Sequence, residues 1–176
     1  MLFRPILTLA FACMTFAGRS PMKGPTTAFD LILDIKRIDD SLQALCADLQ
    51  SYNSSKPIYG PITADISHIH LSNRKACLDA RFAEPFNSTY STSIVEYIIK
   101  TVGVNIPAAA QVLNSKKSDF RGQEHLILGV TKMLKQDHDS LSEALMSKIT
   151  ADQDRANLVV KKINNALQSS IDAYSP

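Results

Sequence analysis

Apolar residues recur at helical spacing from residue 27 onward. In the first segment they are separated by alternating steps of three and four residues: Ile35, Ile38, Leu42, Leu45, Leu49 and Tyr52. This spacing places side chains on one face of an α-helix, and the residues between them are mostly polar. Thr27 and Asp30 resemble a capping box at its start. The pattern predicts a long helix over 27–52.

Three further segments carry the same pattern. Helices are predicted over 60–82 and 122–148, and a final helix runs from the Thr150/Gln153 pair, which resembles a capping box, almost to the C-terminus. The final segment is marked by apolar residues at steps of three and four: Ala156, Val160, Ile163, Leu167, Ile171 and Tyr174.

The segment between residues 84 and 120 is less regular. Ser93 and Glu96 have capping-box spacing ahead of a β-branched run that ends at Val102, so a strand competes with a short helix. The helix is favoured because its neighbours are helical and no partner strand is evident. Gly103 and Asn105 are expected to end it. A fourth helix then begins near Pro107 and continues to Phe120.

These elements predict an all-α fold, an antiparallel bundle of five or six helices. No Asn-Gly or Asp-Gly hairpin signal is present. Because the connections are short, helices that are neighbours in sequence are expected to pack antiparallel.

The N-terminus has the pattern of a secretory signal peptide. Arg4 precedes an apolar or small run over 5–16, and small residues, among them Thr15, Ala17 and Gly18, lead up to a predicted cleavage site after Gly18. The predicted organisation is a cleaved signal peptide over 1–18, a flexible linker over 19–26 and a helical-bundle domain over 27–176. The protein is therefore expected to be extracellular, and any association with a cell wall to be non-covalent.

The charge is nearly balanced, with 19 Lys and Arg against 17 Asp and Glu. Such a surface argues against nucleic-acid binding and against a polybasic membrane patch. No second apolar run has the roughly 20 residues that a membrane-spanning helix needs, so no integral membrane association is expected.

No catalytic or cofactor motif is present, so we expect neither an enzyme nor a cofactor. His68 and His70 are two residues apart on a predicted helix and therefore point to different faces, which argues against a metal site. Asp137 lies on an apolar row. It either reaches water or a lysine at the edge of that row, or it marks a polar group inside a cavity.

Export makes two covalent features possible. Cys46 and Cys77 are the two cysteines after the signal peptide and are candidates for a disulfide. That bond requires the second helix to begin late, near residues 65–68, because an earlier start separates the two cysteines along an antiparallel pair. Asn53 and Asn87 begin sequons for N-glycosylation.

The core composition is aliphatic, with no Trp. Helices packed through aliphatic side chains can leave a slot for a flexible apolar chain, although an ordinary filled core has the same composition. The candidate ligand-lining residues lie on three of the predicted helix faces: Ile35, Leu42, Leu126, Val130, Met133, Leu134, Leu141, Leu145 and Ile163.

Two regions resemble the fungal hydrophobic-surface-binding and cell-wall galactomannoprotein family. One is the segment 140–148 with the closing helix that ends in Ala173-Tyr174-Ser175, and the other is the first helix with Asp34-Ile35, Ile38-Asp39 and Ser51-Tyr52-Asn53. The similarity covers about 27–175. It implies a secreted helical bundle that binds hydrophobic solid surfaces or holds fatty-acid chains in an internal cavity.

The leading hypothesis is accordingly a secreted, non-enzymatic binder of fatty-acid-like chains or apolar surfaces. The alternative is a secreted effector or inhibitor module that binds a protein partner and no lipid.

Overall fold

The computed structural model describes residues 25–53 and 60–176, and in these ranges every regular element is helical. The elements are α1 (Ala28–Ser51), α2 (Pro61–Phe82), α3 (Ser88–Lys100), α4 (Val102–Ser115), the 3-10 turn η1 (Lys117–Phe120), α5 (Glu124–Met146) and α6 (Gln153–Tyr174). The all-α prediction is confirmed. The predicted signal peptide, 1–18, and most of the linker lie outside the described residues.

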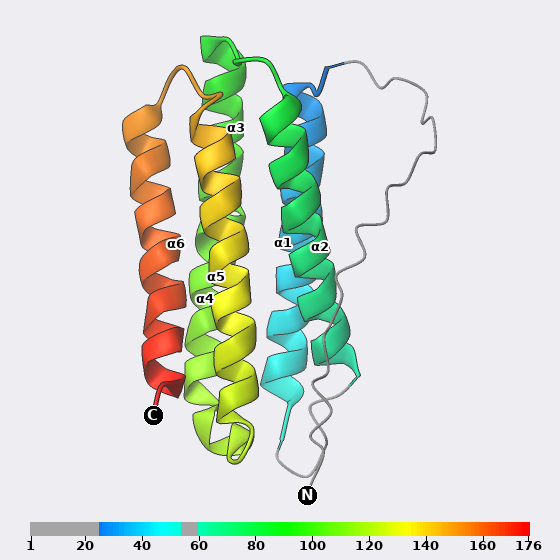
Figure 1. Ribbon diagram of the computed structural model, residues 1–176, viewed down its shortest axis with the longest axis vertical. Helices are drawn as coiled ribbons and strands as arrows, with labels where there is room; N and C mark the ends of the chain where they lie inside the picture. The colour runs from blue at the N-terminus through cyan, green and yellow to red at the C-terminus, as the bar shows by residue number, and fades with distance from the viewer. Residues whose placement is uncertain (1–24, 54–59) are drawn as a thin grey trace, which may run out of the picture.

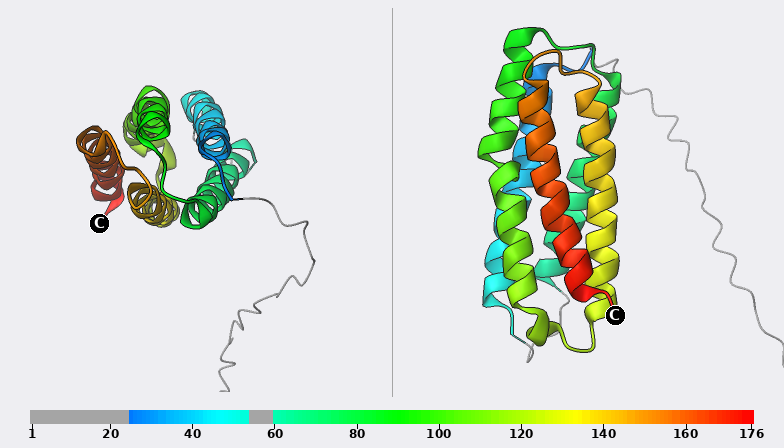
Figure 2. Two further views of the ribbon diagram at one scale, coloured as in Figure 1. Left: turned by 90° about the horizontal axis from the view of Figure 1, so that it is seen from above. Right: turned by 90° about the vertical axis from the view of Figure 1, so that its left-hand side faces the viewer.

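The helices form a closed ring of five rods, because α3 and α4 follow each other with only Thr101 between them (Figures 1 and 2). Around the ring the order is α1, α2, α5, α6 and the α3–α4 rod. Consecutive rods run in opposite directions, as expected. However, α2 with α3 and α4 with α5 do not pack along their lengths, so the expectation of antiparallel packing is wrong for these pairs. Instead α2 lies beside α5, α6 beside α4 and α1 beside α4, all in parallel.

One end of the ring is closed by an aromatic cluster. The rings of Tyr52 and Phe120 stack with centroids 4.6 Å apart, and Tyr174 meets Phe120 edge-on at 6.5 Å. The hydroxyl of Tyr174 donates to the carbonyl of Leu113 at 2.8 Å. Tyr52 caps the end of α1, and Tyr174 is the last residue of α6. Both belong to the segments that resemble the family, and both pack on the buried Phe120.

The other end is held by contacts of the loop before α6 with the loop before α3 and with the first turn of α3. The Thr150 hydroxyl donates to the carbonyl of Phe86 at 2.6 Å, and the Thr150 backbone N–H donates to Oγ of Ser91 at 3.0 Å. The predicted Thr150/Gln153 capping box is wrong, because Thr150 is engaged in this loop contact. Asp152 is the residue before α6 and has a left-handed backbone (φ 59°) without a side-chain cap.

The middle of the chain differs from its prediction in three respects. First, α3 begins at Ser88, and its cap is Asn87, whose side chain accepts from the backbone N–H of Tyr90 at 2.9 Å. The predicted Ser93/Glu96 capping box is therefore wrong. Second, the helical chain resumes at Val102, and Gly103, Asn105 and Pro107 all lie inside α4.

Third, α4 ends at Ser115, and Phe120 belongs to the separate turn η1. Gly103 and Asn105 do not end the helix as predicted, because the break falls at Thr101, two residues before the glycine. Gly103 is needed for a close approach to α6, since a Cβ there would lie 2.6 Å from Cγ2 of Val159.

Cys46 and Cys77 are free thiols, so the possible disulfide is not formed. The physical reason is the start of α2 at Pro61 rather than near residues 65–68. Cys77 is buried and its Sγ lies 3.5 Å from the carbonyl oxygen of Ser140 on α5, whereas Cys46 is half-buried on α1. Among the sequon residues, Asn53 and Asn87 are both exposed.

Over the described ranges, no helix combines the length and the apolar character that crossing a membrane requires.

Candidate functional site

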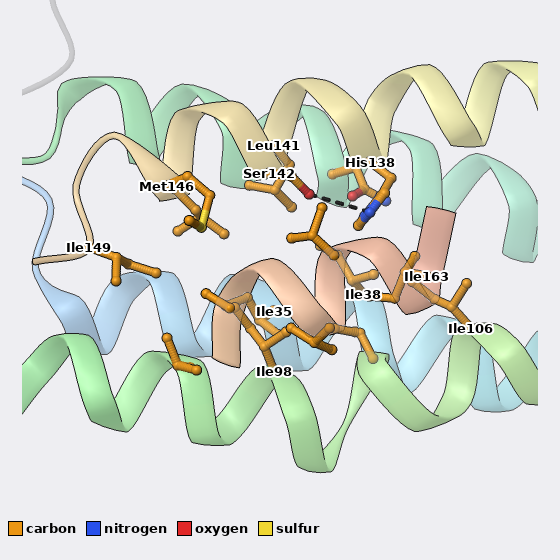
Figure 3. Close-up of a pocket in the computed structure, with 17 residues that line it drawn as sticks. Ile35, Ile38, Ile98, Ile106, His138, Leu141, Ser142, Met146, Ile149 and Ile163 are labelled. Atoms are coloured by element: carbon orange, nitrogen blue, oxygen red, sulfur yellow. Dashed lines mark hydrogen bonds between the residues drawn. The ribbon is translucent and has the colours of Figure 1, made fainter. Parts of the chain in front are cut away.

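A cavity of about 50 Å³ lies on the axis of the ring (Figure 3). All five rods contribute to its wall, as does Ile149 in the loop before α6. The wall is mainly branched aliphatic, and its apolar residues are Ile35, Ile38, Val95, Ile98, Val102, Ile106, Leu141, Leu145, Met146, Ile149, Ala156, Val159, Val160 and Ile163. The three polar residues of the wall are Asn73, His138 and Ser142.

The cavity follows from the ring arrangement. Five rods around one axis leave a central space that only side chains can fill, and few aromatic rings are available to fill it. Most wall residues are β-branched or leucine, which keep few rotamers and cannot collapse fully into the gap. Met146 is the flexible exception, at the end of α5.

His138 is the polar group that faces this apolar space. It is 8% exposed, and its Nε2 lies 3.4 Å from Oγ of Ser142 one turn along α5 (Figure 3). Burial lowers the pKa of His138 to about 4, an effect only partly offset by the nearby charge of Asp139. The imidazole is therefore neutral at neutral pH, so the cavity wall carries no charge there.

Asn73 on α2 is also buried, and its side-chain Nδ2 donates to the carbonyl of Ile69 at 3.0 Å. It lines this cavity and also an outer groove between α2 and α5.

The structure brings four of the nine sequence-predicted lining residues to the cavity: Ile35, Leu141, Leu145 and Ile163. The other five lie elsewhere, which corrects the predicted set. Leu42 lines a separate recess near Cys46, Met133 lines the outer groove, and Leu126 is 38% exposed. Val130 and Leu134 are half-buried outside the cavity wall.

The error on α5 has a physical cause. This helix packs against both α2 and α6, so its apolar surface is wider than one row. Met133 lines the outer groove toward α2, whereas the buried inner row passes through Ile127, Thr131 and His138. A pattern that reads only hydrophobic residues therefore mixes outer-row residues with Leu141 and Leu145 of the inner face, and it omits His138.

Asp137 belongs to the outer row and has a partner that the sequence did not indicate. Its Oδ2 lies 2.5 Å from Nδ1 of His70 on α2, rather than beside a lysine, and it lines the outer groove rather than the cavity. Two residues that appeared unrelated in sequence thus join α2 to α5. Across the described ranges, no three His, Cys, Asp or Glu side chains converge to hold a metal ion.

Comparison with known proteins identifies the family. The model of the family described as "Hydrophobic surface binding protein A" matches residues 29–147. The chain belongs to this family. No curated protein matches the sequence significantly.

Solved structures share the fold at low sequence identity. Afmp4p in complex with palmitic acid superposes with a TM-score of 0.79 at 21% identity, covering 85% of this chain and 100% of that one. Ligand binding domain 1 of the Penicillium marneffei MP1 protein, complexed with arachidonic acids, gives 0.78 at 16% identity with 85% and 100% coverage. Domain 2 of that protein, complexed with multiple arachidonic acids, gives 0.75 at 18% identity with 88% and 98% coverage.

Proposed function

We propose that this protein is a non-enzymatic binder of fatty-acid-like chains and that the central cavity receives the chain. The observation that carries the proposal is an aliphatic cavity on the axis of a five-rod ring. It is supported by the family and by the palmitic and arachidonic acids held by proteins of the same fold.

The size of the cavity implies that binding widens the ring. A space of about 50 Å³ is well below the roughly 300 Å³ at which sites for drug-sized ligands begin. A long chain must therefore displace wall side chains or separate two rods. Each rod has its main contacts with only two neighbours, so the ring can widen by loosening a single seam.

The chemistry of the wall selects the apolar part of a ligand. With Asn73, His138 and Ser142 uncharged at neutral pH, a carboxylate inside the cavity has no counter-charge, and burying it there is unfavourable. The chain is therefore expected inside and the charged end outside.

The proposal is tested with a substitution on α6 that fills the cavity. Ala156 lines it and is 3% exposed, so Ala156→Leu places three additional carbons in the space. We expect palmitate affinity, measured by calorimetry on delipidated protein, to fall about tenfold or more while the melting temperature is maintained. Ala47→Leu, at an exposed position of α1, is the matched control. Unchanged palmitate affinity in Ala156→Leu would place the ligand elsewhere.

Adsorption to apolar surfaces is a second candidate, favoured by an exposed stripe on α2. Leu71, Leu78 and Phe82 are 62%, 53% and 76% exposed, and steps of seven and four residues align them on one face. Changing all three to Gln is expected to reduce retention on polystyrene beads. The control changes Phe29 and Leu158, which are 67% and 69% exposed on other helices. Equal loss in both variants would exclude a specific adsorbing face.

We also propose that the protein is exported and that its signal peptide is cleaved after Gly18. Any association of the mature protein with a cell wall is then non-covalent. N-terminal sequencing of protein recovered from the medium of a secreting host is expected to begin at Arg19. A product that retains Met1 would contradict it.

A further inference from the structure

An open groove runs between α2 and α5 on the outside of the ring. These two helices lie side by side (Figures 1 and 2). Its volume is about 380 Å³. The α2 side contributes His70, Asn73, Arg74, Cys77, Leu78 and Arg81, and the α5 side contributes Met133, Gln136, Asp137 and Ser140.

The groove adjoins the central cavity. Asn73 lines both spaces, and its buried amide is the polar side chain that they share. Asn73 therefore stands where the outer groove comes nearest to the apolar interior. The seam between α2 and α5 is thus a short route from the surface to the cavity.

The groove carries uncompensated positive charge. Arg74 and Arg81 are exposed, and within the described ranges neither forms an ion pair or a side-chain hydrogen bond. Asp137 is the one carboxylate among the described residues that line the groove, and it is hydrogen-bonded to His70 at 2.5 Å, so two arginines against one carboxylate leave a net positive charge. Elsewhere on α2, by contrast, Lys75 is paired with two carboxylates.

The two arginines share one helix face. A step of seven residues is nearly two turns, or about 10.5 Å along the axis, so both guanidinium groups reach toward the same groove. A guanidinium donates two parallel hydrogen bonds to a carboxylate or phosphate, which a lysine cannot do. Gln136 and Ser140 add neutral donors from α5.

From this arrangement we propose that the α2–α5 groove binds the anionic headgroup of an acyl lipid through Arg74 and Arg81, with the chain passing Asn73 into the cavity. The inference rests on the proposed function, since it needs a chain inside the ring. The groove would hold the charged end of the ligand, which the neutral cavity wall does not accommodate.

The test separates headgroup from chain. Palmitate and hexadecanol have chains of equal length, and only palmitate is anionic. In the double variant Arg74→Gln/Arg81→Gln we expect palmitate affinity to fall about tenfold or more, the effect of losing hydrogen bonds to a charged group. Hexadecanol affinity is expected to stay within about twofold. Arg121→Gln, at an exposed loop position, is the matched control and is expected to change neither.

A second pair of ligands distinguishes the possible headgroups. Palmitoyl lysophosphatidate carries a phosphate on the same chain, so a larger loss for it than for palmitate would assign the groove to phosphate-headed lipids. A larger loss for palmitate would assign it to free fatty acids. Either result supports the anionic site.

Failure of the proposed function and failure of the headgroup site give different results in this experiment. Wild-type protein that takes up neither palmitate nor hexadecanol overturns the proposed function and this inference with it. Wild-type protein that takes up both, with the double variant retaining full palmitate affinity, overturns this inference alone. Equal losses for palmitate and hexadecanol in the double variant would also overturn it, because the arginines would then act on the chain or the fold.

Discussion

The ammonium group of Lys75 on α2 lies 2.7 and 2.8 Å from the two carboxylate oxygens of Asp34 on α1. Asp34 is 1% exposed and also accepts from Arg37 at 2.6 Å. Burial raises the pKa of Asp34, and the hydrogen bond from Lys75 opposes that rise. A buried carboxylate in the α1–α2 seam is thus tolerated because cations from both helices reach it.

Removing one of these cations should destabilise the seam. We expect Lys75→Met to lower the free energy of unfolding by about 1–3 kcal/mol, since Asp34 loses a partner but keeps Arg37. Urea denaturation measures the change. Lys36→Met is the control, because among the described residues Lys36 forms an ion pair only with Asp40, on the exposed face of α1. Equal effects of the two variants would show that burial of Asp34 is not the cause.

The close approach of α4 to α6 predicts opposite effects at two helical glycines. A Cβ at Gly103 would lie 2.6 Å from Cγ2 of Val159 and 2.9 Å from the carbonyl oxygen of Ile98, so Gly103→Ala is expected to lower stability by about 1–3 kcal/mol. A Cβ at Gly129 in α5 meets no atom within 4 Å. Gly129→Ala should therefore raise stability by about 0.5–1 kcal/mol.

Thermal and urea denaturation of both glycine variants provide the check. A stabilising Gly103→Ala would mean that the junction of α3 and α4 shifts away from α6 without penalty.

The long helices are predictable because each buries one face in the ring. The steps of three and four in 27–52 reflect the single buried face of α1, and Thr27 and Asp30 form the predicted capping box, with the Thr27 N–H 2.9 Å from the Asp30 carboxylate. The other two predicted boxes fail. Ser93 sits inside α3, and Thr150 is held by the facing loop. Local spacing does not reveal these tertiary partners.

The site is less predictable than the fold for a related reason. Which apolar row of α5 faces the axis depends on the helices beside it, and α2 lies there although α4 precedes α5 in sequence. His138 and Asn73 face the interior as polar residues, so hydrophobic periodicity omits them. The ring order that brings His70 to Asp137 is a long-range property that the sequence pattern does not contain.

His138 predicts a loss of stability in acid. Its pKa is about 4 in the folded protein against an ordinary value of 6.5, so the unfolded chain binds more protons between these values. The contribution of the neutral His138 imidazole to the free energy of unfolding is complete above pH 6.5. It is lost as the pH drops toward 4, and the loss amounts to roughly 3 kcal/mol. His138→Gln should flatten this part of the pH profile. His125→Gln, at an exposed position of α5, should leave it unchanged, and identical profiles for both variants would contradict the assignment.

Asp65 predicts the opposite trend. This residue near the start of α2 is half-buried, and burial raises its pKa above the usual 3.8, with the nearby carboxylate of Asp48 raising it further. The folded state therefore holds the proton more tightly than the unfolded chain, and stability falls as the pH rises through the raised pKa. Asp65→Asn removes the charge, so its melting temperature should exceed that of wild type at pH 7. The gain should shrink as the pH approaches 3, where both states of the wild-type carboxyl are protonated. A variant that is less stable than wild type at pH 7 would show that the ionised Asp65 carboxylate stabilises the α1–α2 seam.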